Sequence, residues 1–342
     1  MTAPTPTEEA RLIRLPRSPR RMLESGLRVQ ARYPVFQIAA LAALLAFGAL
    51  TIDDFATPSS LSAMLVLAAI LGVAAAGQTL VILVGGIDLS VASWVVAGAS
   101  MTIELSGKLH WPFVLALAAI VAVAAAAGGF AGYLSSRLRI QPLIVTLAVG
   151  SCVAGGILAS IGTYVNGRPP DWLQQAASPA GQTLGLPLPP VVFLWAALAV
   201  VLAVFLHLTP AGRRLYATGS NPRAADVALV RTRRVWTGAF MASAVLAALT
   251  GVLIAGFSGA SDASLGDPYL WLSLTAVIVG GSSFGGRGDY WRTALGCLFL
   301  IALSTVMIGH GLTVDDQQIV NGLLIFAVVG FYARERRLAD RV

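Results

Sequence analysis

Long apolar runs without charged residues constrain the fold of this chain more than any other feature. A helix that crosses a bilayer needs roughly 20 mainly apolar residues, and the sequence contains ten candidates. They cover residues 34–51, 61–84, 89–106, 112–134, 142–162, 190–208, 235–257, 269–286, 290–309 and 316–332. The segments of a transmembrane β-barrel would instead alternate in polarity. The pattern predicts an all-α, polytopic integral membrane protein with about ten transmembrane helices.

Composition supports the same class of protein. Of the 342 residues, 57% are hydrophobic and only 11% are charged, whereas about 25% of the residues of an ordinary soluble domain are charged. The two cysteines, Cys152 and Cys297, both fall inside apolar runs, where a cysteine is expected to pack as a small buried side chain. These positions exclude a disulfide framework and a cysteine-rich metal site.

The distribution of charge predicts the membrane topology. The net charge of +7 could indicate a nucleic-acid-binding protein, but cytoplasmic loops of membrane proteins also carry an excess of Lys and Arg. With a cytoplasmic N-terminus and ten spans, every basic residue except Lys108 and Arg168 falls on the cytoplasmic side. We therefore expect a multi-pass membrane protein with both termini in the cytoplasm and no nucleic-acid partner.

Three regions follow from this topology. Residues 1–33 are polar and rich in Arg and Pro and are expected to form a cytoplasmic tail or a surface helix. Residues 34–332 form the transmembrane domain, and residues 333–342 form a second cytoplasmic tail. A cleaved signal peptide fits less well, because its charged region would be unusually long and the first apolar run ends at Asp53 without a small-x-small site.

Two glycine-rich segments are expected to break helices, one near residues 85–90 and one near residues 280–289. The first, Val84 to Ser90, carries no Lys or Arg, unlike an ordinary cytoplasmic loop, and therefore indicates irregular backbone at membrane depth. Such backbone is tolerated where it is buried in protein or lines a wet cavity, and transporters place substrate sites there. Asp88 either contacts a translocation path or, together with Ser90, caps the following helix, and capping is the favoured role.

The glycine-rich segments are not phosphate-binding loops. A Walker A motif requires Gly-Lys followed by Ser or Thr, and the only lysine, Lys108, is followed by Leu109. The three histidines lie far apart in the sequence, and no serine has His and Asp partners on one face. The sequence therefore predicts no ATPase activity, no catalytic residues and no metal site.

The longest inner connection, residues 209–234, has the signals of a short helix. Asn221 can cap a helix that starts with Pro222, and small apolar residues from Ala224 to Ala228 would form its surface. Such a surface can dock into another protein or lie on anionic lipid. The residues alone leave both interpretations open.

Several motifs of this chain match those of one known family, and they occur along the chain in the same order as in that family. They are Gly77 to Ile82 with Gly85-Gly86-Ile87-Asp88-Leu89-Ser90-Val91, Ile140 to Leu147, Gly212 to Pro222 with Ala224-Ala225, Gly280 to Ser283 with Gly285 to Gly288, and Asn321 to Leu324. The chain resembles the membrane subunits of bacterial ABC importers for monosaccharides, the ribose and xylose permeases, from about residue 60 to residue 330.

The resemblance implies a ten-helix permease of the bacterial inner membrane that forms the path for a sugar or a similar small polar solute. It also implies a second permease subunit in a homodimer, a cytoplasmic ABC ATPase that uses the ATP, and an extracytoplasmic solute-binding protein, with no cofactor bound by this chain. Within residues 209–234, ATPase coupling is then expected of Gly212, Arg213, Tyr216, Gly219, Asn221, Pro222, Ala224 and Ala225.

Polar residues inside the apolar runs are candidates for the substrate path. They are Gln78, Thr79, Asp88, Ser90, Thr146 and Asn321. Taken singly, each of the neutral side chains within the helices is expected to bridge neighbouring helices, and as a set they are the best candidates for lining the path. The alternative function is an ion-coupled secondary transporter, but that class usually buries several ionisable residues and here Asp88 stands almost alone.

Overall fold

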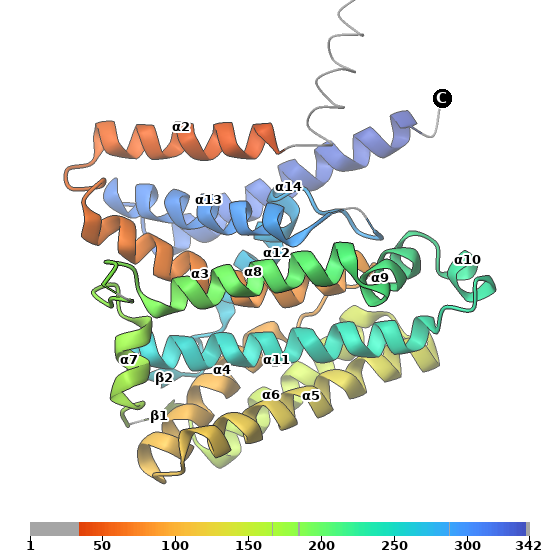
Figure 1. Ribbon diagram of the computed structural model, residues 1–342, viewed down its shortest axis with the longest axis horizontal. Coiled ribbons are helices and arrows are strands. Elements are labelled where there is room, and N and C mark those ends of the chain that lie inside the picture. Colours follow the sequence, from red (N-terminus) through yellow and green to blue (C-terminus); the bar gives the residue numbers. More distant parts are fainter. Residues whose placement is uncertain (1–33, 166, 184, 287, 340–342) are drawn as a thin grey trace, which may run out of the picture.

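The computed structural model describes residues 34–339 except Asn166, Leu184 and Arg287, and from residue 327 onward it describes the backbone alone. The tail predicted for residues 1–33 and the last three residues of the predicted C-terminal tail lie outside the described residues. The described chain is mostly helical (Figure 1). Its helices are α2 (Val35–Thr51), α3 (Pro58–Leu83), α4 (Val91–Met101), the π-helix η1 (Thr102–Lys108), α5 (Phe113–Leu138), α6 (Pro142–Ser160), α7 (Asp171–Ala177), α8 (Pro190–Leu208), α9 (Pro210–Ser220), α10 (Pro222–Val227), α11 (Thr232–Ser258), α12 (Asp267–Val279), α13 (Tyr290–Gly309) and α14 (Val314–Ala339).

Six of these helices are long and apolar enough to cross a membrane, namely α3, α5, α6, α8, α11 and α13. Helices α2 and α12 are apolar but shorter. The described residues also include a small sheet, in which strands β1 (Tyr164–Val165) and β2 (Ser261–Asp262) pair antiparallel with Tyr164 opposite Asp262. The coarse prediction of a helical, polytopic membrane protein is confirmed.

Two predicted spans differ from the helices observed. The run 269–286 ends as a helix at Val279, because Gly281 takes a left-handed φ of 95° that an α-helix cannot continue. The run 89–106 begins as a helix at Val91 and changes to a π-helix at Thr102. The predicted runs extended across both changes, although η1 contains Glu104 and Ser106 and residues 280–286 are mostly Gly and Ser.

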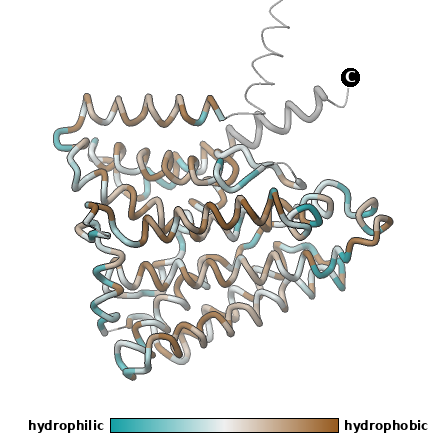
Figure 2. Tube along the Cα trace, viewed as in Figure 1, coloured by the Kyte–Doolittle hydropathy of each residue, from teal (hydrophilic) through white to brown (hydrophobic). Residues whose placement is uncertain are grey.

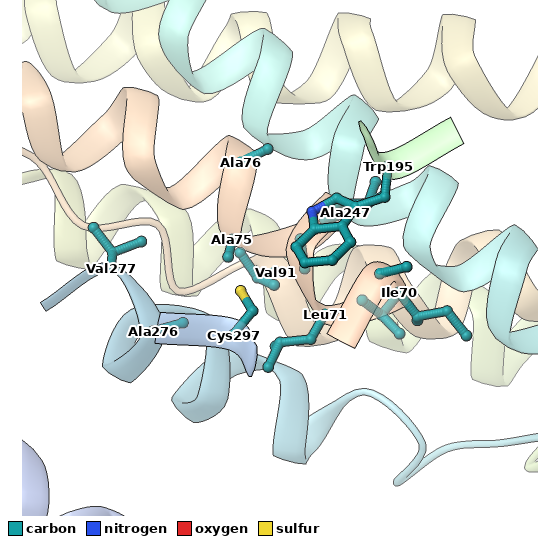
Figure 3. Packing of buried hydrophobic residues seen from close by; sticks show 14 of the residues in the cluster. Ile70, Leu71, Ala75, Ala76, Val91, Trp195, Ala247, Ala276, Val277 and Cys297 are labelled. Atoms are coloured by element: carbon teal, nitrogen blue, oxygen red, sulfur yellow. The ribbon is translucent and has the colours of Figure 1, made fainter. Parts of the chain in front are cut away.

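Helix α3 lies at the centre of the bundle. Its apolar window is 89% buried, and it contacts α8, α11, α12 and α13. Figure 3 shows side chains of α3, α4, α8, α11, α12 and α13 meeting in this core, with Trp195 of α8 and Cys297 of α13 among them. Cys297 is fully buried as predicted, but the prediction for Cys152 is wrong, because α6 turns this side chain to the surface of the single chain.

Small residues let α11 contact α4 backbone to backbone. A Cβ atom on Gly98 would lie 2.0 Å from the carbonyl oxygen of Ala248, and one on Gly251 would lie 2.0 Å from that of Val95. Membrane helices associate through such close packing, because lipid offers no hydrophobic driving force between helices. The abundance of Gly and Ala in the sequence thus has a direct packing role.

Charged residues gather at the two ends of the bundle. The end on the right of Figure 1 collects the ends of α3, α5 and α8, the helices α9 and α10, and the starts of α11 and α13. We call it the arginine-rich end; its described arginines are Arg137, Arg139, Arg213, Arg214, Arg223, Arg231, Arg233, Arg234 and Arg292. The opposite end carries Asp53, Asp54, Asp171 and Asp262, and Figure 2 shows apolar helices running between the two polar ends.

Candidate functional site

Helices α9 and α10 lie at the arginine-rich end, and each begins with a capping side chain followed by a proline. The hydroxyl of Thr209 accepts a hydrogen bond from the backbone N–H of Gly212 (3.1 Å), and Pro210 occupies the first turn of α9. The side chain of Asn221 accepts one from the N–H of Ala224 (3.0 Å), followed by Pro222 in α10. The capping predicted for Asn221 is confirmed, whereas the cap by Thr209 was missed although Thr followed by Pro is a start signal.

Helix α9 touches the end of α3. A Cβ atom on Gly219 would lie 1.9 Å from the carbonyl oxygen of Leu83, so the two backbones are in direct contact and a larger residue cannot fit. Immediately beyond Leu83 the chain enters the segment 84–90 that separates α3 from α4. The candidate coupling helix is therefore joined to the first glycine-rich break.

The same part of α9 also touches the second glycine-rich segment. The hydroxyl of Tyr216 donates a hydrogen bond to the carbonyl oxygen of Gly288 (2.7 Å), and the N–H of Gly285 donates one to Ile82 of α3 (3.2 Å). Burial raises the pKa of Tyr216 to about 12, with a further contribution from the nearby Asp289 carboxylate, so the hydroxyl stays protonated as the donor. We call the contact formed by Leu83, Tyr216, Gly219, Gly285 and Gly288 the α9 junction.

Side chains from other helices hold the segment 280–289 in place. The carboxylate of Asp289 caps α13 by accepting from the N–H of Arg292 (3.1 Å), and it forms an ion pair with the Arg292 side chain (3.5 Å). From α2, the amide of Gln37 donates to the carbonyl oxygen of Gly280 (3.3 Å). The role of Gln37 could not be inferred from the sequence, because its partner is 243 residues away.

The first break brings together three of the predicted path residues. The carboxylate of Asp88, only 1% exposed, accepts hydrogen bonds from the N–H (2.9 Å) and the hydroxyl (2.5 Å) of Ser90. The hydroxyl of Thr146 on α6 accepts one from the N–H of Leu89 (3.0 Å) and donates to Pro142 (3.0 Å). The predicted cap is wrong, because no side chain caps the free N–H groups of α4. Asp88 instead stabilises the turn before α4 through Ser90, and Thr146 attaches that turn to α6.

The other predicted path residues are more dispersed. Thr79 of α3 donates to the carbonyl oxygen of Ala75 (2.7 Å) and shares a hydrogen bond with Thr293 of α13 (3.0 Å). The neighbouring Gln78 is fully buried, and neither polar atom of its amide has a hydrogen-bond partner among the described residues. Asn321 lies partly exposed on α14, and no described hydrogen bond links it to the rest of the set. Five of the six predicted positions are therefore buried, Asn321 is not, and the sequence did not predict how they group.

A small cavity lies beside α4, next to the turn that Ser90 and Thr146 stabilise at its start. It has a volume of about 90 Å³, and its polar lining consists of Ser93, Ser100, Thr163 and Asp267. A Cβ atom on Gly150 of α6 would lie 3.1 Å from the Cα of Ser90 and 3.2 Å from the hydroxyl of Ser93. The interface between α4 and α6 thus runs from Thr146 and Ser90 to this hydroxyl-lined cavity.

A buried network that the sequence did not indicate holds three helices together. The indole N–H of Trp195 on α8 donates to the hydroxyl of Tyr290 on α13 (2.8 Å), which donates to the carbonyl oxygen of Gly72 on α3 (2.7 Å).

Within the described residues, no group of three or more His, Cys, Asp or Glu side chains could hold a metal ion.

Comparison with known proteins gives a consistent result. Residues 60–329 match the family model described as the branched-chain amino acid transport system permease component. The chain is 29% identical over 309 residues to the fructose import permease protein of Rhizobium meliloti, covering 88% of this chain and 85% of the relative. It is 31% identical over 281 residues to the ribose import permease protein of Bacillus subtilis, covering 81% and 85%. No solved structure matches this chain.

Proposed function

Because the chain belongs to the family of ABC-importer permease components, with monosaccharide import permeases among its relatives, we propose that it forms the membrane path for a monosaccharide or a similar small polar solute. It is a transport subunit without an ATPase motif of its own. The energy is supplied by a separate cytoplasmic ATPase, which uses the ATP, and the chain itself binds no cofactor. An extracytoplasmic binding protein delivers the solute.

The α9 junction is the observation that carries this proposal. An importer driven by a separate ATPase needs a rigid element at the cytoplasmic surface that transmits motion to the path. Helix α9 contacts both glycine-rich breaks, through Gly219 on Leu83 and Tyr216 on Gly288. Beyond it, α10 is almost entirely exposed and offers the docking surface. In this account Gly212, Arg213, Tyr216, Gly219, Asn221, Pro222, Ala224 and Ala225 form the coupling segment.

The proposed topology has ten membrane segments and both termini in the cytoplasm. To the six long apolar helices it adds α2, α4 with η1, α12 and α14. Helix α12 has 13 residues and would span only about 20 Å at 1.5 Å per residue, as expected of a helix interrupted at membrane depth. The arginine-rich end faces the cytoplasm, in agreement with the positive-inside rule.

The proposed path follows the interface between α4 and α6. The hydroxyl-lined cavity at Ser93, Ser100, Thr163 and Asp267 lies along one part of it, and Ser90, Thr146 and Asp88 lie along the next. Gln78, Thr79 and Asn321 complete the proposed lining. Since α6 leaves most of its surface exposed in the single chain, a second copy in a homodimer would enclose the path.

Substitution at Gly219 tests the coupling role. The variant Gly219→Ala places a methyl group against the carbonyl oxygen of Leu83 and should lower ATP-driven monosaccharide uptake about 10-fold or more in liposomes that contain the purified complex. The control is Gly238→Ala in α11, where the added methyl group meets no atom within 4 Å. Uptake by Gly219→Ala equal to that of Gly238→Ala would contradict the coupling role of α9.

A further inference from the structure

A cavity of about 340 Å³ opens at the arginine-rich end, separate from the α9 junction. It is lined by Arg214 of α9, Leu229 and Arg231 of the connection after α10, and Arg234 and Val235 at the start of α11. In Figure 1 this region lies on the right, where the chain passes from α10 into α11. The cavity thus collects three guanidinium groups and two aliphatic side chains from separate parts of the segment 209–235.

The charges around this cavity are not balanced by acidic side chains. Among the described residues, ion pairs join Lys108 to Glu104 and Arg292 to Asp289, and neither involves an arginine of the cavity. The nearest carboxylate along the chain, that of Asp226, accepts a hydrogen bond from Thr232 (2.7 Å) and does not line the cavity. Three cations therefore share a concave surface without an anionic partner from this part of the chain.

The start of α11 adds to the positive potential. Its first turn contains no acidic residue, and no side chain caps it. The N-terminus of a helix carries a partial positive charge, so cations there are unfavourable and anions are favourable. An anion bound between Arg231 and Arg234 would offset this unfavourable charge, and arginine binds phosphate through paired hydrogen bonds.

Apolar side chains beside the arginines define the kind of anion. Leu229, which lines the cavity together with Val235, is 90% exposed, and Figure 2 shows a hydrophobic stretch at this tip next to the hydrophilic start of α11. Helix α8 ends, and α11 begins, at the arginine-rich end (Figure 1), which in the proposed orientation faces the inner surface of the bilayer. A ligand with a phosphate and an attached hydrocarbon part satisfies both kinds of lining.

We propose that this cavity binds the phosphate of an anionic phospholipid from the inner leaflet. The phosphate lies among Arg214, Arg231 and Arg234, and the glycerol and acyl part lies against Leu229 and Val235. The bound lipid attaches the start of α11 to the membrane surface beside the coupling segment. The proposal rests on the proposed membrane orientation, and it does not require that α9 couples to an ATPase.

Lipid binding by the purified full-length chain, without any ATPase, tests this proposal. The probes are short-chain phosphatidylglycerol, short-chain phosphatidylcholine and inorganic phosphate, and the readouts are the rise in Tm and the bound lipid counted by native mass spectrometry. We expect phosphatidylglycerol to bind and to raise Tm, with phosphatidylcholine and inorganic phosphate at least 10-fold weaker. In the variant Arg214→Gln/Arg231→Gln/Arg234→Gln, the affinity for phosphatidylglycerol should fall at least 10-fold.

The matched control removes the same charge from the same end. Its substitutions are Arg137→Gln, Arg213→Gln and Arg233→Gln, at exposed arginines that do not line the cavity, and it should keep the affinity within about 2-fold. An equal loss in both triple variants, or unchanged binding in the cavity variant, would overturn the proposal. Inorganic phosphate as strong as phosphatidylglycerol would also overturn it and would assign the cavity to a soluble anion.

Single substitutions keep the test decisive if the triple variant does not fold. Arg214→Gln, Arg231→Gln and Arg234→Gln should each weaken binding about 3-fold, and no loss in any of them would count against the site. The variant Ala224→Trp in α10 separates this proposal from the coupling proposal: Ala224 is exposed and does not line the cavity, so the variant should lose ATPase docking and keep full lipid binding. A failure of coupling and a failure of lipid binding are therefore distinguishable.

Discussion

Tyr290 joins three helices through one hydroxyl group. It accepts from the indole of Trp195 and donates to the carbonyl oxygen of Gly72, all within the core around α3. In the membrane, hydrogen bonds between helices contribute about 0.6 kcal/mol on average and up to about 1.7 kcal/mol. Because two bonds meet at one atom, Tyr290 has more effect on stability than a single polar contact.

We therefore expect Tyr290→Phe to lower the free energy of unfolding by about 1 kcal/mol. The reason is that the Trp195 N–H and the Gly72 carbonyl oxygen both lose their partner in the core. Reversible unfolding in mixed micelles measures this change. The control is Tyr164→Phe, where the side chain is 58% exposed. A Tyr290→Phe variant as stable as this control would contradict the structural role of the network.

At the scale of residues, the sequence predicted contacts between residues that lie a few positions apart along the chain. The cap by Asn221 could be predicted because its partner, Ala224, lies three positions on. The contacts of Gln37 with Gly280 and of Thr79 with Thr293 join residues more than 200 positions apart, and no local pattern specifies them. Asp88 combines both cases, since its hydrogen bonds with Ser90 are local and its burial is tertiary.

At the scale of elements, α9 and α10 differ in their surroundings: α9 packs against the two glycine-rich breaks, whereas α10 is mostly exposed. Residues Pro222, Ala224 and Val227 of this short helix are exposed, and only Ala225 is buried. A small, mildly apolar surface of this kind is suited to a cleft in a partner protein. Enlarging one of its exposed residues should therefore prevent docking and leave the fold of the chain unchanged.

We expect Ala224→Trp to reduce the amount of ATPase that co-purifies with the chain about 10-fold. Overpacking a fitted contact typically costs 1–3 kcal/mol, and about 1.4 kcal/mol corresponds to a factor of ten in affinity. The Tm of the isolated chain should not change. The control is Ala180→Trp, since Ala180 is also exposed but lies at the opposite end of the bundle. Full ATPase recovery with Ala224→Trp would remove α10 from the proposed docking surface.

Helix boundaries show where prediction from hydropathy stops. The start of α6 at Pro142 and the interval between α13 and α14 agree with the apolar runs, because each boundary coincides with a change in polarity. The end of α12 at Val279 and the π-helical turn from Thr102 do not, because α12 ends before a Gly- and Ser-rich segment without charge, and the π-helix begins two residues before Glu104. Both departures involve helices beside the proposed path.

At the scale of the whole molecule, the two ends of the bundle differ in charge and in structure. The arginine-rich end carries α9, α10 and the α9 junction, and the opposite end carries β1, β2 and α7. This asymmetry matches the needs of a permease that receives solute on one side and an ATPase on the other. The charge distribution in the sequence already predicted the orientation, but the convergence of both glycine-rich breaks on α9 is visible only in three dimensions.

The most direct test of the central claim measures the energy source of transport. The chain is purified with the ATPase that accompanies it and is reconstituted into liposomes with its binding protein and a panel of labelled monosaccharides. The account predicts uptake that requires ATP hydrolysis and continues when ionophores have removed every ion gradient. Uptake that persists without the ATPase and stops on addition of the ionophores would contradict it and would identify an ion-coupled transporter.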